Sequence, residues 1–191
     1  SSACWPSSSP LGAGPVGAEG GVLVDFIAQA VAVVAGHGGD LRQIDGSGSA
    51  YQLVLGFGAP TSTPDDVNAA VGCCLRLLRL AEAHGLVASA GVATGEVFCA
   101  DLGGHGEYVV VGDSVNHAAR LAAHADPTVL LVDDTTARRC SSHFAIAPAG
   151  TIPLKGRTDE IAHTVAGLRG DRRAATAPRV AHFTVGRDRE L

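Results

Sequence analysis

The chain has 191 residues, of which 46% are hydrophobic and 17% are charged, and its formal net charge at pH 7 is −5. This length suits one domain with its own hydrophobic core, and the composition is too apolar for a disordered chain. Because nucleic-acid grooves need a basic face, the negative charge argues against a nucleic-acid partner.

Targeting and redox signals are absent from the sequence. The opening residues contain no apolar run flanked by positive charge, so they do not resemble a signal peptide. The apolar stretch 22–34 is interrupted by Asp25 and Gln29 and is too short to span a bilayer. Five cysteines, two of them adjacent and none in CxxC spacing, indicate neither a disulfide framework nor a zinc site. We therefore expect a cytoplasmic protein without a membrane span.

The first half of the chain predicts two helices and two strands. Apolar spacing over residues 22–35 predicts a helix that stops at Gly36. A second helix is expected to start at Thr63, a capping residue followed by Pro64 and two aspartates, and to end at Gly85. The strands predicted between these helices are residues 41–44 and 52–57.

The second half of the chain predicts mainly strands. Residues 87–94 and 97–102 are expected to form a hairpin. The β-rich run 108–111 leads through a glycine into a helix, for which Asp113 or Ser114 is the expected N-cap. The remaining predicted strands are 129–132, 144–147 and 161–165. The order β-α-β-β-α-β with additions predicts an α/β (α+β) fold with a ferredoxin-like core plus extra strands and helices.

Two polar residues of the helix after residue 111 are candidates for a binding site. Asn116 and Arg120 are four residues apart and share one helical face. A face of small residues, among them Val115, Ala118 and Ala122, can pack closely on a sheet. Arginine offers a fork of donors to phosphate oxygens, and asparagine offers a donor and an acceptor. The pair suits a substrate with phosphates and a ribose; on spacing alone, a surface Arg and a helix-start Asn without a role remain the alternative.

Four short segments stand out along the chain: FGAP at 57–60, GVATGEV at 91–97, GDSVNHAARL at 112–121 and LKG at 154–156. In this order they resemble four segments of the class III nucleotidyl cyclases, the adenylyl and guanylyl cyclase catalytic domain. GDSVNHAARL is similar to the family pattern Gly-Asp-x-Val-Asn-x-Ala-x-Arg-Leu. Within the family the chain resembles the second cyclase domain of soluble, bicarbonate-responsive adenylyl cyclases, through GVATGEVFCADLG followed by EYVVVG.

This resemblance implies an active site between two cyclase domains that pair head to tail. One domain contributes two aspartates that hold two divalent metal ions, and the other contributes a purine-reading pair with an Asn and an Arg. Asn116 and Arg120 match the catalytic Asn and Arg. Gln43 and Val109 occupy the purine-reading positions, and Lys155 matches a phosphate-binding lysine.

The positions that hold the metal in the family lack carboxylates here. Counting back from FGAP, one of them is Tyr51, which cannot replace a carboxylate for magnesium. The other should lie on a strand before the first helix, where ACWPSSSPLG has two prolines and no acidic residue. We therefore expect no metal ligand on this chain, and Mg²⁺ or Mn²⁺ to be supplied through a partner domain.

The domain organisation also follows the resemblance. Residues 1–18 are a poorly defined or degenerate segment, 19–168 a cyclase homology domain, and 169–184 an Arg- and Ala-rich linker. Residues 185–191 resemble the start of an ATPase-like module. The chain contains no methionine, so we expect it to be a piece of a larger protein.

Two functions are compatible with these observations. The first is the metal-site-deficient second half of an adenylyl cyclase, which pairs with another cyclase domain in the same polypeptide or as a homodimer and converts ATP to cyclic AMP and diphosphate. The isolated chain is then expected to be inactive. The alternative, favoured by Tyr51, Gln43 and Val109, is a non-catalytic pseudocyclase domain for dimerisation or for sensing a small ligand such as bicarbonate, which regulates an attached ATPase module. An RNA-binding ferredoxin-like module is disfavoured by the acidic charge and the scarcity of aromatic residues.

Overall fold

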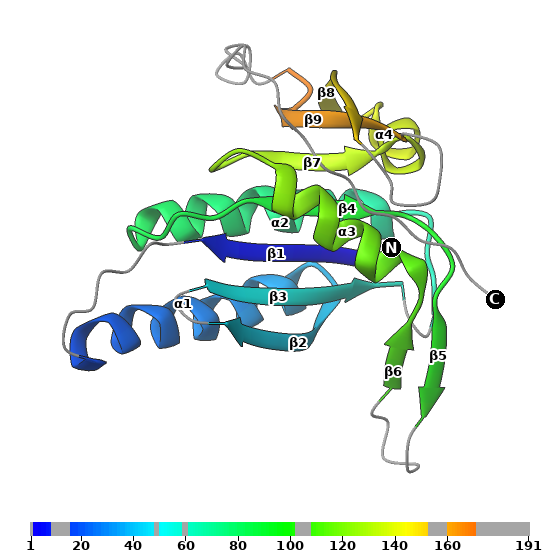
Figure 1. Ribbon diagram of the computed structural model, residues 1–191. Coiled ribbons are helices and arrows are strands. Elements are labelled where there is room, and N and C mark those ends of the chain that lie inside the picture. Colours follow the sequence, from blue (N-terminus) through cyan, green and yellow to red (C-terminus); the bar gives the residue numbers. More distant parts are fainter. Residues whose placement is uncertain are drawn as a thin grey trace.

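The fold is a seven-stranded sheet with helices on both faces, from which a two-stranded hairpin projects (Figure 1). A computed structural model describes residues 2–8, 16–47, 50–58, 61–101, 108–152 and 160–170. The sheet order is β2-β3-β1-β4-β7-β9-β8, and β5 pairs with β6. The elements are β1 (Ser2–Ser8), α1 (Val16–Gly36), β2 (Gly39–Ser47), β3 (Ala50–Phe57), α2 (Asp66–Ala83), β4 (Ala90–Ala93), β5 (Phe98–Asp101), β6 (Tyr108–Val111), α3 (Asp113–His124), β7 (Leu130–Asp133), α4 (Asp134–Cys140), β8 (Phe144–Ile152) and β9 (Glu160–Leu168).

The first six elements form the predicted ferredoxin-like core. They follow the order β1-α1-β2-β3-α2-β4, and their strands lie side by side as β2-β3-β1-β4. β1 is antiparallel to both β3 and β4. The remaining strands extend the sheet beyond β4, because β7 pairs with β4 in parallel and β9 and β8 follow in antiparallel register.

The two faces of the sheet carry different helices. α1, α2 and α4 lie on one face, and α3 contacts β1, β4 and β7 on the other. Strand β3 illustrates the alternation of side chains between the two faces. Its Leu53 and Leu55 belong to the large core under α1 and α2, whereas Val54 belongs to the smaller core under α3. No helix in the described ranges combines the length and the apolar character needed to cross a membrane.

The structure differs from the sequence-based expectations in its strand pairing and in its helices. Residues 87–94 and 97–102 do not form a hairpin, because β4 is a central strand between β1 and β7 while β5 pairs with β6 instead. Helix α4 was not predicted; a short helix of seven residues has too little apolar periodicity to be recognised. Residues 2–8 form β1, a strand that includes Pro6.

The expected N-cap of α3 is also wrong. Gly112 is the N-cap and the helix begins at Asp113, so neither Asp113 nor Ser114 caps it. A Cβ atom on Gly112 would meet the carbonyl oxygen of Glu96 and the Cα of Val97 at 3.0 and 3.2 Å. This crowding explains why a glycine joins β6 to α3.

Candidate functional site

The candidate site is the outer face of α3. Its inner face is buried through Ser114, His117, Ala118, Leu121 and Ala122. Asn116 and Arg120 are both exposed, one turn apart, on the side of the helix turned away from the sheet. The predicted packing face is therefore confirmed, with Val115 and Ala119 half-buried at its border.

Arg120 is the cation of this outer face. His124 follows it by one further turn, and partial desolvation lowers the pKa of His124 below its usual value, so this imidazole is neutral at pH 7. Arg120 makes no ion pair with any residue in the described ranges. Its guanidinium is therefore available to an anionic group.

Close backbone packing fixes the position of α3. A Cβ atom on Gly91 of β4 would overlap the carbonyl oxygen of Ala118, the Cβ of Leu121 and the amide nitrogen of Ala122. The buried Ser89 hydroxyl donates to the carbonyl oxygen of Ala122 at 2.7 Å. Sequence analysis identified GVATGEV as a motif but not this role of its first glycine, because contact with α3 is non-local.

The predicted purine-reading residues lie on separate strands. Gln43 is exposed on the edge strand β2, opposite Val54, and so shares the α3 side of the sheet. Its Nε2 donates to Oδ2 of Asp45 at 2.8 Å. Val109 lies in β6, opposite Ala100 of β5. No strand pairing joins β2 to β6, and Lys155 lies outside the described residues.

The strand that contains Tyr51 lies beside β1, the strand where the second metal position is expected. Tyr51 at the start of β3 is half-buried and lies in register with Ser7 of β1 and Gly46 of β2. A tyrosine hydroxyl is a poor substitute for the charged oxygens that Mg²⁺ selects. Within the part of the chain that the structure describes, no group of three His, Cys, Asp or Glu side chains could hold a metal ion.

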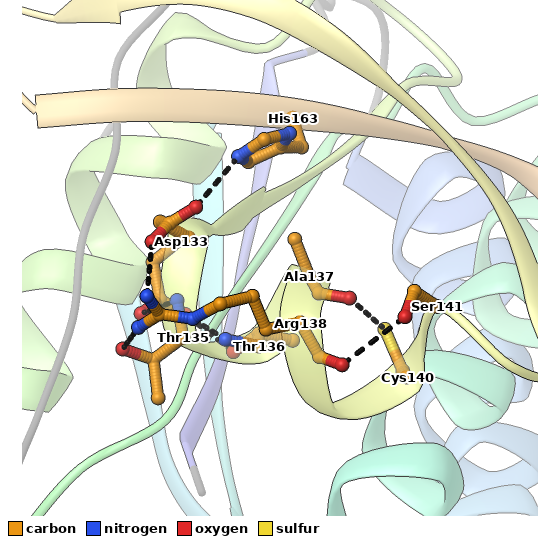
Figure 2. Close-up of polar contacts among 9 residues, drawn as sticks. Asp133, Thr135, Thr136, Ala137, Arg138, Cys140, Ser141 and His163 are labelled. Carbon is orange, nitrogen blue, oxygen red and sulfur yellow. Dashed lines mark hydrogen bonds and ion pairs between the residues drawn. The ribbon is translucent and has the colours of Figure 1, made fainter.

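A buried polar cluster at the start of α4 was not predicted. Asp133 is fully buried and caps α4 by accepting hydrogen bonds from the amides of Thr135 and Thr136, both at 3.1 Å (Figure 2). It also accepts from the Thr136 hydroxyl and from the Thr94 amide at 3.2 Å. The sequence signal was the aspartate before two threonines at the end of a strand. Because backbone amides occupy its carboxylate, we interpret this cluster as structural.

His163 of β9 points toward the same helix start (Figure 2). Its Nε2 lies 3.3 Å from Oδ1 of Asp134, whose other oxygen forms an ion pair with Arg138 at 3.0 Å. These contacts connect β9 to α4 on the sheet face opposite α3. They place no polar group near Asn116 and Arg120.

Comparison with known proteins identifies the family of this domain. The family described as "Adenylate and Guanylate cyclase catalytic domain" matches residues 22–167. Two curated relatives, the uncharacterized proteins Rv1320c of Mycobacterium tuberculosis and Mb1354c of Mycobacterium bovis, are each 30% identical over 186 residues. The match takes in 85% of this chain but only 32% of each relative, so the chain spans about a third of their length.

Solved structures share the fold. The guanylate cyclase domain of RhGC from Catenaria anguillulae, in complex with GTP, has a TM-score of 0.73 at 19% identity and covers 88% of this chain and 96% of its own. The adenylyl cyclase CyaB from P. aeruginosa has a TM-score of 0.72 at 19% identity, covering 89% and 95%. At these identities the likeness concerns the fold.

Proposed function

Because the chain belongs to the adenylate and guanylate cyclase catalytic domain family, we propose that it is the second-half domain of an adenylyl cyclase. In this proposal it pairs with another cyclase domain, which contributes the metal ligands, and the two convert ATP to cyclic AMP and diphosphate. The partner domain lies in the same polypeptide or in a second protomer.

The observation that carries the proposal is the outer face of α3. Asn116 and Arg120 are exposed one turn apart on a helix whose opposite face is packed without space against β4 at Gly91. Groups on a rigid, well-packed element keep their positions during a reaction, and preorganised donors stabilise a transition state most effectively.

The chemistry that these side chains can perform is positioning and charge stabilisation. Attack of the ribose 3′ hydroxyl on the α-phosphate increases negative charge on the phosphate oxygens. The Arg120 guanidinium offers two parallel donors to those oxygens, and the Asn116 amide can hydrogen-bond the ribose. Holding the hydroxyl in line with phosphorus lowers the entropic part of the barrier.

The divalent metal must come through the partner. The chain has Tyr51 at one expected metal position and no acidic residue in β1, where the other is expected, so its residues do not fit a metal pair. When bound by the partner's carboxylates, Mg²⁺ or Mn²⁺ would neutralise phosphate charge. This division of labour motivates the second-half assignment.

We further propose weak discrimination between ATP and GTP. The Gln43 amide nitrogen is already hydrogen-bonded to Asp45, and valine at position 109 offers a base no polar side-chain atom. Selectivity of a site requires a penalty for the wrong base, which comes from buried polar groups left unpaired. Equilibrium titration of the paired domains with non-hydrolysable ATP and GTP analogues tests this, and strong selectivity for adenine would contradict it.

Reconstitution with a matched partner tests the catalytic proposal. The partner is a cyclase domain that retains both metal aspartates but has its own Asn and Arg replaced by alanine. With ATP and Mn²⁺, we expect cyclic AMP only from the mixture, and its loss when this chain carries Arg120→Ala. Arg139→Ala, an exposed arginine on α4, is the control that should retain activity. A mixture without activity, despite a demonstrated complex, would refute the catalytic role.

A non-catalytic pseudocyclase is the second candidate. Tyr51 at a metal position and the engaged Gln43 amide favour it. Such a domain would dimerise or bind a small anion, for instance bicarbonate through Arg120 or Lys155, and would regulate the ATPase-like module that residues 185–191 resemble. An inactive complex that binds bicarbonate, with loss of that binding in Arg120→Ala or Lys155→Ala, would support this reading over the first.

A further inference from the structure

A groove of about 640 Å³ lies on the face of the sheet opposite α3. It follows the exposed side of α2 beside the C-terminal half of α1 and ends at the first residue of β8 and the last residue of β9. Its lining is Gln29, Val33, His37, Gly72, Leu75, Arg76, Arg79, Leu80, Ala83, Phe144 and Leu168. None of these residues belongs to the site proposed above.

The floor of the groove is apolar and built around a glycine. Gly72 lies in the middle of α2, where a glycine costs about 1 kcal/mol of helix stability relative to alanine. A Cβ atom there would make only ordinary contacts, 3.9 Å from His37 and Phe144, so crowding does not require the glycine. Its absence of a side chain keeps the groove open between α1 and Phe144.

The rim of the groove is cationic and apolar. Arg76 and Arg79 are exposed, and neither forms an ion pair with a residue in the described ranges. Leu168 is 60% exposed at the end of β9. Nδ1 of His37 lies 2.8 Å from the carbonyl oxygen of Val33, which can only accept, so this nitrogen carries the proton. The chain as a whole has a net charge of −5, which makes this pair of arginines a local exception.

We propose that this groove docks an acidic amphipathic helix of a partner protein. A groove between two helices suits a helix that inserts apolar side chains at i, i+3, i+4 and i+7. The part of α2 from Gly72 to Ala83 is about 16 Å long, which accommodates three helical turns. Glutamates flanking the apolar side chains of the partner would pair with Arg76 and Arg79.

The positive charge of the groove rim favours an acidic helix over two other possible occupants, which are residues 171–191 of the chain and an anionic membrane surface. Residues 171–191 of the chain contain five arginines against Asp171, Asp188 and Glu190, so this segment is repelled by the rim. An anionic membrane surface is recognised by clusters of four to eight basic residues, whereas this rim has two arginines. Two arginines beside an apolar floor match a peptide with a few carboxylates.

Fluorescence anisotropy with the full 191-residue chain tests the proposal. The probe is a labelled amphipathic peptide of about five helical turns with leucines on one face and glutamates at its borders. The matched control peptide has lysine in place of every glutamate. We expect the acidic peptide to bind at least about tenfold more tightly than the lysine peptide, with affinity falling as salt rises.

Substitutions in the groove test whether the peptide binds there. R76E/R79E should weaken the acidic peptide by about tenfold or more and improve binding of the lysine peptide, whereas R139E on α4 should leave both unchanged. Gly72→Met should fill the groove with a flexible apolar chain and weaken binding without lowering the melting temperature. If the Gly72→Met variant fails to fold, the R76E/R79E double variant still tests the proposal.

Several results would overturn the proposal. They are equal binding of the two peptides, unchanged binding by R76E/R79E, or no binding of either peptide at millimolar concentration. Tighter binding of a peptide with the sequence of residues 171–191, or of vesicles containing phosphatidylserine, would assign the groove to that occupant instead. Self-association of the chain that R76E/R79E abolishes would assign it to a second copy.

Discussion

Exposure to solvent distinguishes Arg120 from the cysteines of this domain. Arg120 is exposed and without an ion pair in the described part of the chain, whereas Cys73, Cys74 and Cys140 are buried in the core beneath α2 and α4. Burial raises the pKa of Cys73 to about 12 and, with a smaller effect of Asp133, that of Cys140 to about 11. The cysteines in α2 thus act as small hydrophobes, as their helical positions predict.

Arg120→Ala is expected to reduce cyclic AMP formation by the paired domains by about 10²- to 10³-fold, because it removes one preorganised donor from the transition state. The thermal unfolding of the chain should be unchanged, since the Arg120 side chain is exposed. Initial rates with ATP and Mn²⁺ measure the effect, and Arg139→Ala is the matched control. Near wild-type turnover by the Arg120 variant would remove this residue from the mechanism.

The buried cysteines are expected to resist alkylation. Only the thiolate reacts, and at pH 8 a thiol with a pKa of about 12 or 11 is almost wholly protonated. Iodoacetamide should leave Cys73 and Cys140 unmodified in the native protein and should modify them after denaturation, which peptide mass spectrometry can follow. Modification of Cys73 in the native state at the rate of a free thiol would show that α2 opens readily.

The helices are positioned by interactions at their ends and by close contacts with strands. At the start of α2, the Asp66 carboxylate accepts hydrogen bonds from the amide and hydroxyl of Thr63, at 2.6 and 2.7 Å, and from the Ser62 hydroxyl at 3.1 Å. These bonds join the turn before α2 to its first residue, but the N-cap is Asp65 and makes no side-chain capping bond, so the predicted cap at Thr63 is wrong. Gly58, at the end of β3, has φ +76° and no room for a Cβ beside the Asp66 carboxylate. The glycine of the FGAP motif therefore leaves room for the Asp66 carboxylate at the first residue of α2.

Asp66→Asn is expected to destabilise the domain by about 1 kcal/mol at neutral pH, because it weakens hydrogen bonds to a charged acceptor. Burial raises the pKa of Asp66, but the hydrogen bonds from Thr63 and Ser62 outweigh it, so the pKa is lowered in the folded state. A lowered pKa gives stability that is present above the unfolded value of 3.8 and is lost as pH falls through the folded value. Urea unfolding of both proteins should therefore differ at pH 7 and converge at strongly acidic pH. A constant difference at all pH values would show that the charge of Asp66 has no role.

Gly91→Ala is expected to lower stability by about 1–3 kcal/mol, because the added methyl overlaps backbone atoms of α3 that cannot move without shifting the helix. Activity of the paired domains should fall as well, since α3 carries Asn116 and Arg120. Gly21→Ala is the control, because nothing lies within 4 Å of its Cβ position and it should be neutral or stabilising. Equal stability of the two variants would mean that α3 does not depend on this contact.

The sheet lies between the two surfaces to which functions are proposed above. Asn116, Arg120 and Gln43 lie on the α3 side, and the groove along α2 lies on the other side, with α1 and α4. The seven strands between them form a continuous ladder. The proposed helix in the groove and the proposed ligand at Asn116 and Arg120 would therefore bind on opposite sides of the sheet.

The isolated chain is expected to form no cyclic AMP from ATP, with either Mg²⁺ or Mn²⁺. Without carboxylates at Tyr51 and in β1, phosphate charge stays uncompensated in the transition state. Purified protein assayed by mass spectrometry for cyclic AMP tests this, and the mixture with a metal-competent partner domain is the positive control. Robust turnover by the chain alone would show that it provides its own metal site.

Local patterns were sufficient to predict most elements. Apolar spacing located α1 and α2, β-rich runs located β3 and β6, and the order of elements predicted the ferredoxin-like core that the structure confirms. The motif at 112–121 identified α3 and the exposure of Asn116 and Arg120. These features depend on side-chain periodicity and turn chemistry within a few residues, which a sequence displays directly.

Strand pairing and the close packing of helices against strands were decided only by the tertiary structure. The sequence could not show that β4 lies between β1 and β7 while β5 turns to β6, because many strand pairings satisfy the same alternation of side chains. α3 packs against Gly91 through Leu121, which is distant from that glycine in sequence. The groove beside Gly72 likewise depends on the distant residue Phe144. The sequence by itself therefore determined the family, the element types and the candidate residues Asn116 and Arg120. The three-dimensional packing decided what holds those residues in place and where a second surface lies, since non-local contacts leave no periodic signal in the chain.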